Sequence, residues 1–263
     1  VINVGGASDA GASTLDITAA KLLLLGNTFS GFTFGGVSQS GNINIAAASS
    51  FANPVTFTTS AATVLSGDLT ATGSAGITVT NGLQVSGANR TITSASGDIA
   101  LNAVDATGTA YGLTLTTTSG TINVGRVGGT SALASLTTSA GGTTNFTGAG
   151  VTTTGVQTYN NAVTLAADNS FATTNSAITF GSTVNSSTST PRALTVGVGS
   201  SNITFTGAVG GAQGLGNISL TSTGTTTISG TINAAAFTQN SVTGTTAING
   251  GNITTTRDRK SVV

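Results

Sequence analysis

The sequence predicts an all-β solenoid with coils of roughly 20 residues, and one short helix near residues 14–25. Three observations favour this fold: apolar and polar residues alternate in short runs, turn-forming residues separate the runs, and a long stretch of the chain repeats itself. A chain this rich in Thr, Gly, Ser and Asn could instead be disordered. Its mean hydropathy of +0.30 argues otherwise, because disordered segments lack the apolar surface that offsets the loss of chain entropy.

Pairs of apolar residues two positions apart mark the expected strands. A period of two buries one side of a strand and leaves the other in solvent. Gly, Asn and Ser cluster between the pairs, where turns need positive φ angles or bonds from side chain to backbone. We expect about two strands in each coil, with these pairs facing inward: Ile43/Ile45, Val55/Phe57, Ile77/Val79, Ile99/Leu101, Leu113/Leu115, Ile122/Val124, Val163/Leu165, Ile178/Phe180, Leu194/Val196 and Ile203/Phe205.

An internal repeat links residues 113–160 with residues 194–241. The offset is 81 residues where Ile122-Asn-Val124 meets Ile203-Thr-Phe205, and 82 residues after one insertion, where Val127-Gly-Gly129 meets Val209-Gly-Gly211. Short strands that cannot enclose a core alone must stack on neighbouring repeats. We therefore interpret the 82-residue unit as four coils, with Ile122 and Ile203 on equivalent rungs. A β-sandwich would not explain the repeat, and the low aromatic content disfavours a propeller.

One segment departs from the strand pattern. Ser13 suits a helix N-cap, Asp16 follows three residues later, and Gly26 is a typical stop. We expect this short helix to pack Leu22, Leu24 or Leu25 against the solenoid.

The domain prediction is one β-solenoid fragment over residues 1–256, cut from a longer protein. Residues 257–263, RDRKSVV, hold four of the fourteen charged residues, so we expect a non-native or disordered tail there. Neither end of the chain resembles a capping repeat, which predicts that further solenoid repeats of the same parent chain adjoin it.

The composition removes most catalytic chemistry. Without Glu, His or Cys, the common acid–base, nucleophile and metal-binding groups are missing. We interpret the remaining carboxylates as turn residues and predict no enzyme activity, no catalytic or metal-binding residue and no cofactor; the ligand-binding residues stay unknown. These carboxylates are Asp9, Asp16, Asp68, Asp98, Asp105, Asp168 and Asp258.

The charge balance and hydropathy exclude two further classes of partner. Net charge is zero and only seven Lys and Arg residues are present, whereas nucleic-acid binding needs clustered cations. No apolar run approaches the roughly 20 residues of a membrane-spanning helix.

Threonine triplets are the one feature with a possible binding role. Stacked Thr side chains on a flat sheet can order water and bind ice, but Thr is also a favoured residue on the outer side of any strand. The triplets are unevenly spaced, and binding to ice or another crystal surface stays an alternative. They lie at Thr78-Val-Thr80, Thr91-Ile-Thr93, 116–118, 152–154 and 225–227.

Several segments resemble the repeat units of giant filamentous-haemagglutinin-like bacterial adhesins. LDITAAKLLLLGNTFSGFTFGG, from Leu15, resembles the helix and Gly-Phe strand that open such units, and GNINIAAASSFANPVTFTT, from Gly41, resembles the strand pair that follows. GVQTYNNAVTLAADNSF, from Gly155, is similar to a recurrent Q-x-Y-x-x-x-V-x-L element. ITFGSTVN and ITFTGAVGG, at Ile178 and Ile203, are similar to the family's strands that end in Gly turns.

The resemblance implies a right-handed parallel β-helix, export from the bacterium and a role at its surface. We expect a structural shaft or adhesive segment that makes repeated contacts with a host or neighbouring cell surface, matrix or glycan. A binding module for ice or crystal surfaces and, less favoured, a carbohydrate-active solenoid enzyme remain alternatives. A flat Thr array would favour the first of these, and a groove with clustered Asp and Arg the second.

Overall fold

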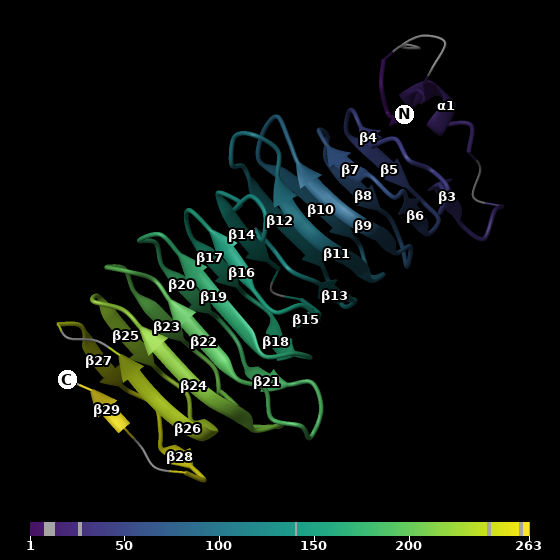
Figure 1. Ribbon diagram of the computed structural model, residues 1–263. Coiled ribbons are helices and arrows are strands. Elements are labelled where there is room, and N and C mark those ends of the chain that lie inside the picture. Colours follow the sequence, from purple (N-terminus) through teal and green to yellow (C-terminus); the bar gives the residue numbers. More distant parts are fainter. Residues whose placement is uncertain (8–13, 26–27, 140, 241–242, 258–259, 263) are drawn as a thin grey trace.

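The computed structural model describes residues 1–7, 14–25, 28–139, 141–240, 243–257 and 260–262. They form an elongated, all-β parallel solenoid of about ten coils, which confirms the predicted fold class (Figure 1). From residue 43 onward, paired residues lie 19 to 25 positions apart: Thr144 pairs with Val163 at one extreme, and Phe180 with Phe205 at the other. A coil is therefore about 22 residues long.

Each complete coil carries three strand positions, and these line up into three faces along the rod (Figure 1). The first face is a continuous ten-stranded sheet. It consists of β5 (Ser49–Phe51), β8 (Leu69–Ala71), β10 (Arg90–Ser94), β12 (Gly112–Thr117), β14 (Ser135–Thr138), β17 (Gln157–Tyr159), β20 (Ile178–Phe180), β23 (Ile203–Phe205), β25 (Thr225–Ile228) and β27 (Thr245–Ile248).

The second and third faces share three long strands that turn a corner: β9 (Ile77–Val85), β11 (Ile99–Ala106) and β26 (Ile232–Asn240). The second face also holds β3 (Phe32–Gly35), β6 (Val55–Thr58), β13 (Thr121–Val124), β15 (Thr143–Phe146), β18 (Ala162–Leu165), β21 (Val184–Ser186) and β28 (Ile253–Thr255). The third face holds β2 (Leu15–Ile17), β1 (Ile2–Val4), β4 (Ile43–Ile45), β7 (Ala62–Leu65), β16 (Val151–Thr153), β19 (Asn169–Thr173), β22 (Leu194–Gly197), β24 (Leu215–Thr221) and β29 (Lys260–Val262).

The expected count of two strands per coil was wrong. An offset of 82 residues spans about 3.7 coils of 22 residues, not four. As a result, Ile122 lies in β13 of the second face and Ile203 in β23 of the first, so the two are not on equivalent rungs. Strands were missed because several inward positions are polar: Thr153 in β16 and Thr226 in β25 are buried and break the apolar pattern.

The two copies of the Val-Gly-Gly motif share the same backbone geometry, although they do not occupy the same face of the rod. Val127 and Val209 each form isolated bridges to the coils before and after. The glycines that follow, Gly128 and Gly210, have φ angles of 67° and 73°. A Cβ atom at these positions would lie 2.1 and 2.0 Å from the carbonyl oxygens of Thr152 and Asn233. Glycine avoids both the strain and the clash, so the motif marks a tight corner.

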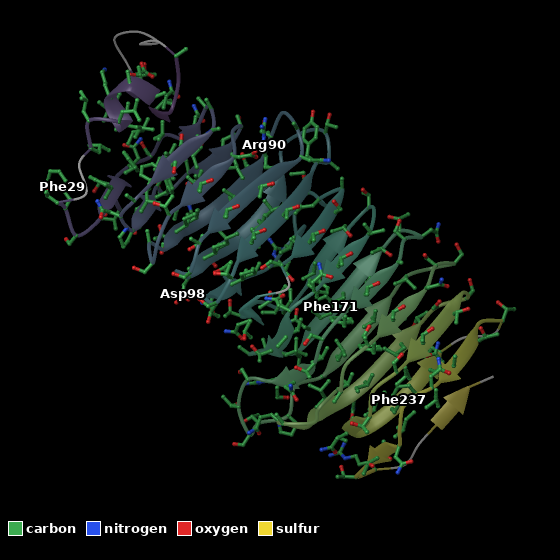
Figure 2. All side chains as sticks on the ribbon, turned by 180° about the vertical axis from the view of Figure 1, so that it is seen from behind. Phe29, Arg90, Asp98, Phe171 and Phe237 are labelled. Carbon is green, nitrogen blue, oxygen red and sulfur yellow. The ribbon has the colours of Figure 1, made fainter. Side chains whose placement is uncertain are left out.

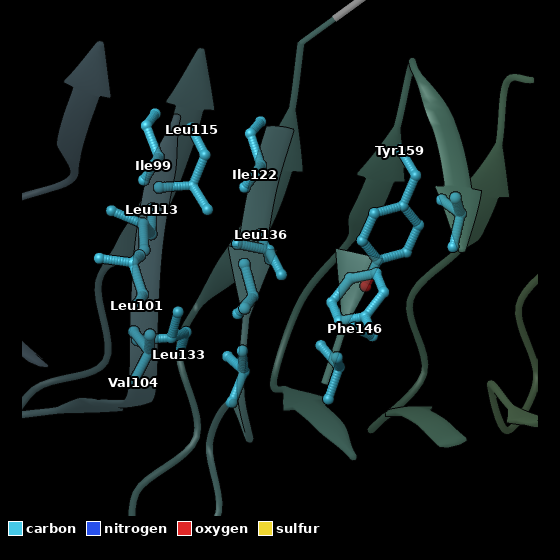
Figure 3. Packing of buried hydrophobic residues seen from close by; sticks show 14 of the residues in the cluster. Ile99, Leu101, Val104, Leu113, Leu115, Ile122, Leu133, Leu136, Phe146 and Tyr159 are labelled. Atoms are coloured by element: carbon cyan, nitrogen blue, oxygen red, sulfur yellow. The ribbon is translucent and has the colours of Figure 1, made fainter. Parts of the chain in front are cut away.

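The interior is one continuous apolar column. Every predicted inward pair is buried, which confirms the orientation of all ten (Figure 3 shows part of the column). Tyr159, Phe180 and Phe205 occupy consecutive rungs of the first face. The rings of Phe180 and Phe205 stack with centroids 5.0 Å apart and an interplanar angle of 2°. Parallel, in-register pairing places the aromatic side chains of successive coils directly beside one another, so their rings stack in the offset geometry that aromatic pairs favour.

A polar layer interrupts this column between β14 and β19. The buried hydroxyls of Thr138 and Thr144 both form hydrogen bonds with the side-chain amide of Asn161. In the neighbouring coil, Tyr159 donates to Gln157 Oε1 at 2.9 Å, and Gln157 Nε2 donates to the carbonyl of Ala172. Because each polar group finds a partner, the layer fixes the register of the coils without an unpaired polar atom at these contacts.

The predicted helix exists but is much shorter than expected. α1 covers Ala19–Leu22, Thr18 is its N-cap, and residues 15–17 form strand β2; the expected cap Ser13 lies outside the described residues. The helix is restricted because Leu15 and Ile17 pair with β1. Leu22 and Leu25 pack against the core as expected, whereas Leu24 is 83% exposed.

Part of the expected tail forms a strand. Residues 260–262 form β29, which pairs with β26; Asp258, Arg259 and Val263 lie outside the described residues, and the expectation of a non-native or disordered tail stays a prediction.

We predict that Ile122→Asp lowers the free energy of unfolding by more than about 3 kcal/mol, because it buries an unpaired charge in the apolar column. Asn123→Asp is the matched control. Asn123 points outward on the same strand, and its Oδ1 accepts a bond from Asn145 that a carboxylate keeps. Urea unfolding followed by circular dichroism measures both. Equal losses in the two variants would contradict the strand register.

The pKa of Tyr159 is raised well above its usual range because burial disfavours the phenolate. The stability that this group contributes is complete below pH 10, the pKa of an unfolded tyrosine, and is lost as pH rises toward the folded pKa. We predict that the free energy of unfolding of the native chain falls more steeply above pH 10 than that of Tyr159→Phe. Urea titrations from pH 8 to pH 11 measure the difference, and parallel curves would contradict the prediction.

Candidate functional surface

The described carboxylates serve the stacking of coils. Asp68, Asp98 and Asp168 each directly precede a strand, and each accepts a hydrogen bond from a backbone N–H in the next coil: those of Thr91, Thr121 and Ala193, at 2.7 to 2.9 Å. Asn89 and Asn202 make the same contact with neutral amides. Since Asn substitutes for Asp in this role, the contact needs a side-chain oxygen and not a charge.

The two remaining described carboxylates also have partners. Asp105 lies within β11, where its Oδ1 accepts bonds from the backbone N–H groups of Thr130 and Ser131. Asp16, in β2, accepts a bond from Asn3 Nδ2 at 2.7 Å. Asp98 precedes β11 (Figure 2), and Asp105 lies near the other end of this strand, beyond the corner that it turns. The two carboxylates thus lie on different faces and bond to different residues of the next coil. Asp9 and Asp258 lie outside the described residues.

Metal-binding clusters are not found in the part of the chain that the structure describes. No group of three His, Cys, Asp or Glu side chains could hold a metal ion there. A hollow at the N-terminal end is lined by Ile2, Leu15, Thr33 and residues 35–39, none of which is titratable.

The outer side of the ten-stranded sheet carries a regular row of threonines. Seven successive strands of this sheet, β10 to β25, each carry a Thr at the same register position, and the pairing places each directly beside the next. In order along the rod, the row is Thr91, Thr114, Thr137, Thr158, Thr179, Thr204 and Thr227. We call this outer surface, from β10 to β25, the threonine face.

The hydroxyls of this row are available to a ligand or to water. All seven side chains are partly exposed, and none of the seven hydroxyls bonds to another group of the described protein. Two residues after each of these threonines comes a small or polar residue. Thr93 and Thr116 lie on β10 and β12, and the other five follow the end of their strand: Ser139, Asn160, Gly181, Thr206 and Ser229. Ser139 and Asn160 bond to the backbone carbonyls of Thr117 and Thr138. From β12 to β25 the strands of this face contain no charged residue.

The other two faces lack such a row. On the second face, the corresponding in-register positions are Thr33, Thr56, Thr78, Ala100, Asn123, Asn145, Thr164 and Asn185. On the third face they begin Asn44, Val64, Gln84 and Asp105. The uniform composition is thus a property of one face.

The triplets singled out in the sequence do not make up this row. Thr78-Val-Thr80 lies on the second face and residues 152–154 on the third. Thr91 and Thr227 belong to two of the triplets, but four members of the row, such as Thr179 between Ile178 and Phe180, are single threonines between two inward residues. The inward apolar pairs of the sequence already contained several of these threonines. Recognising the row required the knowledge that each coil has three strand positions, so that the chain returns to the same face only once per coil.

The N-terminal end presents most of the exposed large apolar side chains. Leu23 and Val37 are 87% and 89% exposed, and Phe29 projects from this end of the rod (Figure 2). Val1, Leu15 and Leu24 join them, whereas elsewhere in the described chain only Val156 and Ile248 are comparable. α1 lies at this end (Figure 1), next to β5, so the end is partly covered.

Comparison with known proteins identifies no relative: no protein-family model, curated protein or solved structure matches the chain. Among the described residues, no helix has the length and apolar character needed to span a bilayer.

We predict that Asp98→Ala lowers the free energy of unfolding by about 1 kcal/mol, because the N–H of Thr121 loses its partner. Asp105→Ala should cost more, since two N–H groups depend on it. Asp98→Asn keeps the acceptor and should be close to neutral. Urea unfolding measures all three. A loss in Asp98→Asn equal to that in Asp98→Ala would show that the charge matters and contradict the capping role.

Proposed function

We propose that the chain is a length of structural rod in a secreted bacterial surface adhesin, where it acts as a shaft and through repeated weak contacts. The observation that carries the proposal is the unbroken ladder of parallel pairs through about ten coils, with one apolar column inside. A solenoid of this kind has neighbours only along its axis, so its length can grow without a change of architecture.

The use of polar groups supports a rod better than an enzyme. The described carboxylates bond backbone or side-chain groups of adjacent coils, and the described cations Lys21, Arg90, Arg126, Arg192 and Arg257 are scattered along the chain. An active site needs such groups gathered in one place. We therefore propose a protein without catalytic activity, cofactor or nucleic-acid partner.

The resemblance to filamentous-haemagglutinin-like adhesins supports a place outside the cell, at the bacterial surface. The partners we propose are a host or neighbouring cell surface, matrix or glycan, together with adjoining solenoid repeats of the same parent chain. The exposed leucines and Phe29 at the N-terminal end support the last of these, because an apolar surface of this kind is favoured at contacts between protein parts.

Removal of one coil tests the rod. Deletion of residues 92–114 joins Thr91 to Leu115, which then takes the place of Ile92 beside Leu69. We predict a folded chain shorter by one rung, about 4.8 Å, by small-angle X-ray scattering and circular dichroism. As the control, deletion of residues 92–103, about half a coil, brings unlike faces together and should unfold the rod. Two equally folded deletions would contradict the solenoid shaft.

Beads coated with the chain test the adhesive part of the proposal. Many weak contacts along a rod give avidity that rises steeply with the density of rods. We expect adherence to cells or matrix to increase more than linearly with coating density, and the 92–114 deletion to retain most of it. A folded chain that holds no bead at the highest density, or loss of all adherence on removal of this one coil, would contradict repeated weak contacts.

A further inference from the structure

We propose that the threonine face binds ice, through ordered water held along its row of threonine side chains. This goes beyond the proposed role as a rod and does not depend on it. The inference rests on the juxtaposition of seven in-register threonines on consecutive strands of one sheet, of which the strands from β12 to β25 carry no charged residue.

The threonines repeat regularly along the rod, and on β10 and β12 a second threonine also extends the array across the face. Strands in a sheet are about 4.8 Å apart, which sets the spacing of hydroxyls along the rod. Residues two apart on one strand are separated by about 6.6 Å, which sets the spacing across the face, as between Thr91 and Thr93 or Thr114 and Thr116. Water oxygens in hexagonal ice repeat at comparable distances in two directions, so the rows can hold water in positions that continue into the crystal.

The chemistry of threonine suits this ligand. Its β-branched side chain has few rotamers, so a row of identical residues in identical backbone settings presents hydroxyls and methyl groups in one orientation. The hydroxyls are free of protein partners, and each can both donate and accept. Charged groups hold water in their own hydration shells, and the strands from β12 to β25 carry none.

A crystalline polysaccharide is the competing ligand for a flat, regular face. Sugar rings are usually held by stacking on exposed aromatic side chains. On this sheet the aromatic residues Tyr159, Phe180 and Phe205 all point into the core, where they are buried. The face therefore offers hydroxyls and methyl groups only, which favours water as the bound layer.

The test grows a hemisphere of ice slowly from a dilute solution of the fluorescently labelled full chain and measures the fraction of protein taken into the ice. We expect incorporation of the native chain and a severalfold loss in Thr179→Tyr, whose ring would stand above the row. Thr195→Tyr is the matched control. Thr195 lies between two inward residues on β22 of the third face, is exposed and has no side-chain partner in the described protein, and its replacement should change nothing.

Circular dichroism on each variant separates a lost surface from a lost fold. If Thr179→Tyr does not fold, Thr137→Tyr probes the same row in β14, where no aromatic ring lies beneath it. Exclusion of the native chain from ice, as for a non-binding globular protein, would overturn the proposal. Equal losses of incorporation into ice in Thr179→Tyr and Thr195→Tyr would overturn it too. Binding to crystalline cellulose or chitin powder that depends on Thr179, without uptake into ice, would assign the face to a polysaccharide and overturn it as well.

Discussion

Every feature of this rod depends on one constraint: the backbone of each coil must find its hydrogen-bond partners about 22 residues away, in the coils before and after. Buried N–H and C=O groups cannot remain unpaired, so the three strand positions of each coil must match those of its neighbours. The corners obey the same requirement. Asp98 and Asn202 accept the first N–H of a strand in the next coil, and Gly128 and Gly210 let the chain turn where a side chain would meet a neighbouring carbonyl.

The same register aligns side chains on both sides of each strand. Inside, it stacks Tyr159, Phe180 and Phe205. It also brings Gln157 within reach of Tyr159, and Asn161 within reach of Thr138, so each of these buried amides has a hydrogen-bond partner. Outside, it aligns Thr158, Thr179 and Thr204 on the same three strands. The register that orders the core therefore also produces a regularly spaced outer surface, provided that the outward residues are alike.

The sequence predicted the solenoid because its strongest signal, inward pairs such as Ile178/Phe180, is also the main packing interaction. It did not predict the three faces. Strands whose inward residues are Thr or Ser carry no apolar signal, and long strands such as β9 pass through a corner that the pattern does not mark. The helix was overestimated because Leu15 and Ile17 satisfy a strand pattern as well as a helical one, and pairing with β1 decided between them. For the same reason the threonine face could not be seen: a row across coils is defined only once the number of strands per coil is known.

Preference for Thr in strands does not explain the threonine face. That preference acts on any half-exposed strand position, and the three faces share the same backbone, coil length and core. If propensity alone selected the outward residues, the second face would carry a similar row. It instead mixes Thr with Ala100, Asn123 and Asn145 at the matching positions, and the third face includes Val64 and Asp105. The second and third faces therefore show which outward residues folding alone selects. The uniform row of threonines on the first face differs from them, and a binding role of that surface explains the difference best.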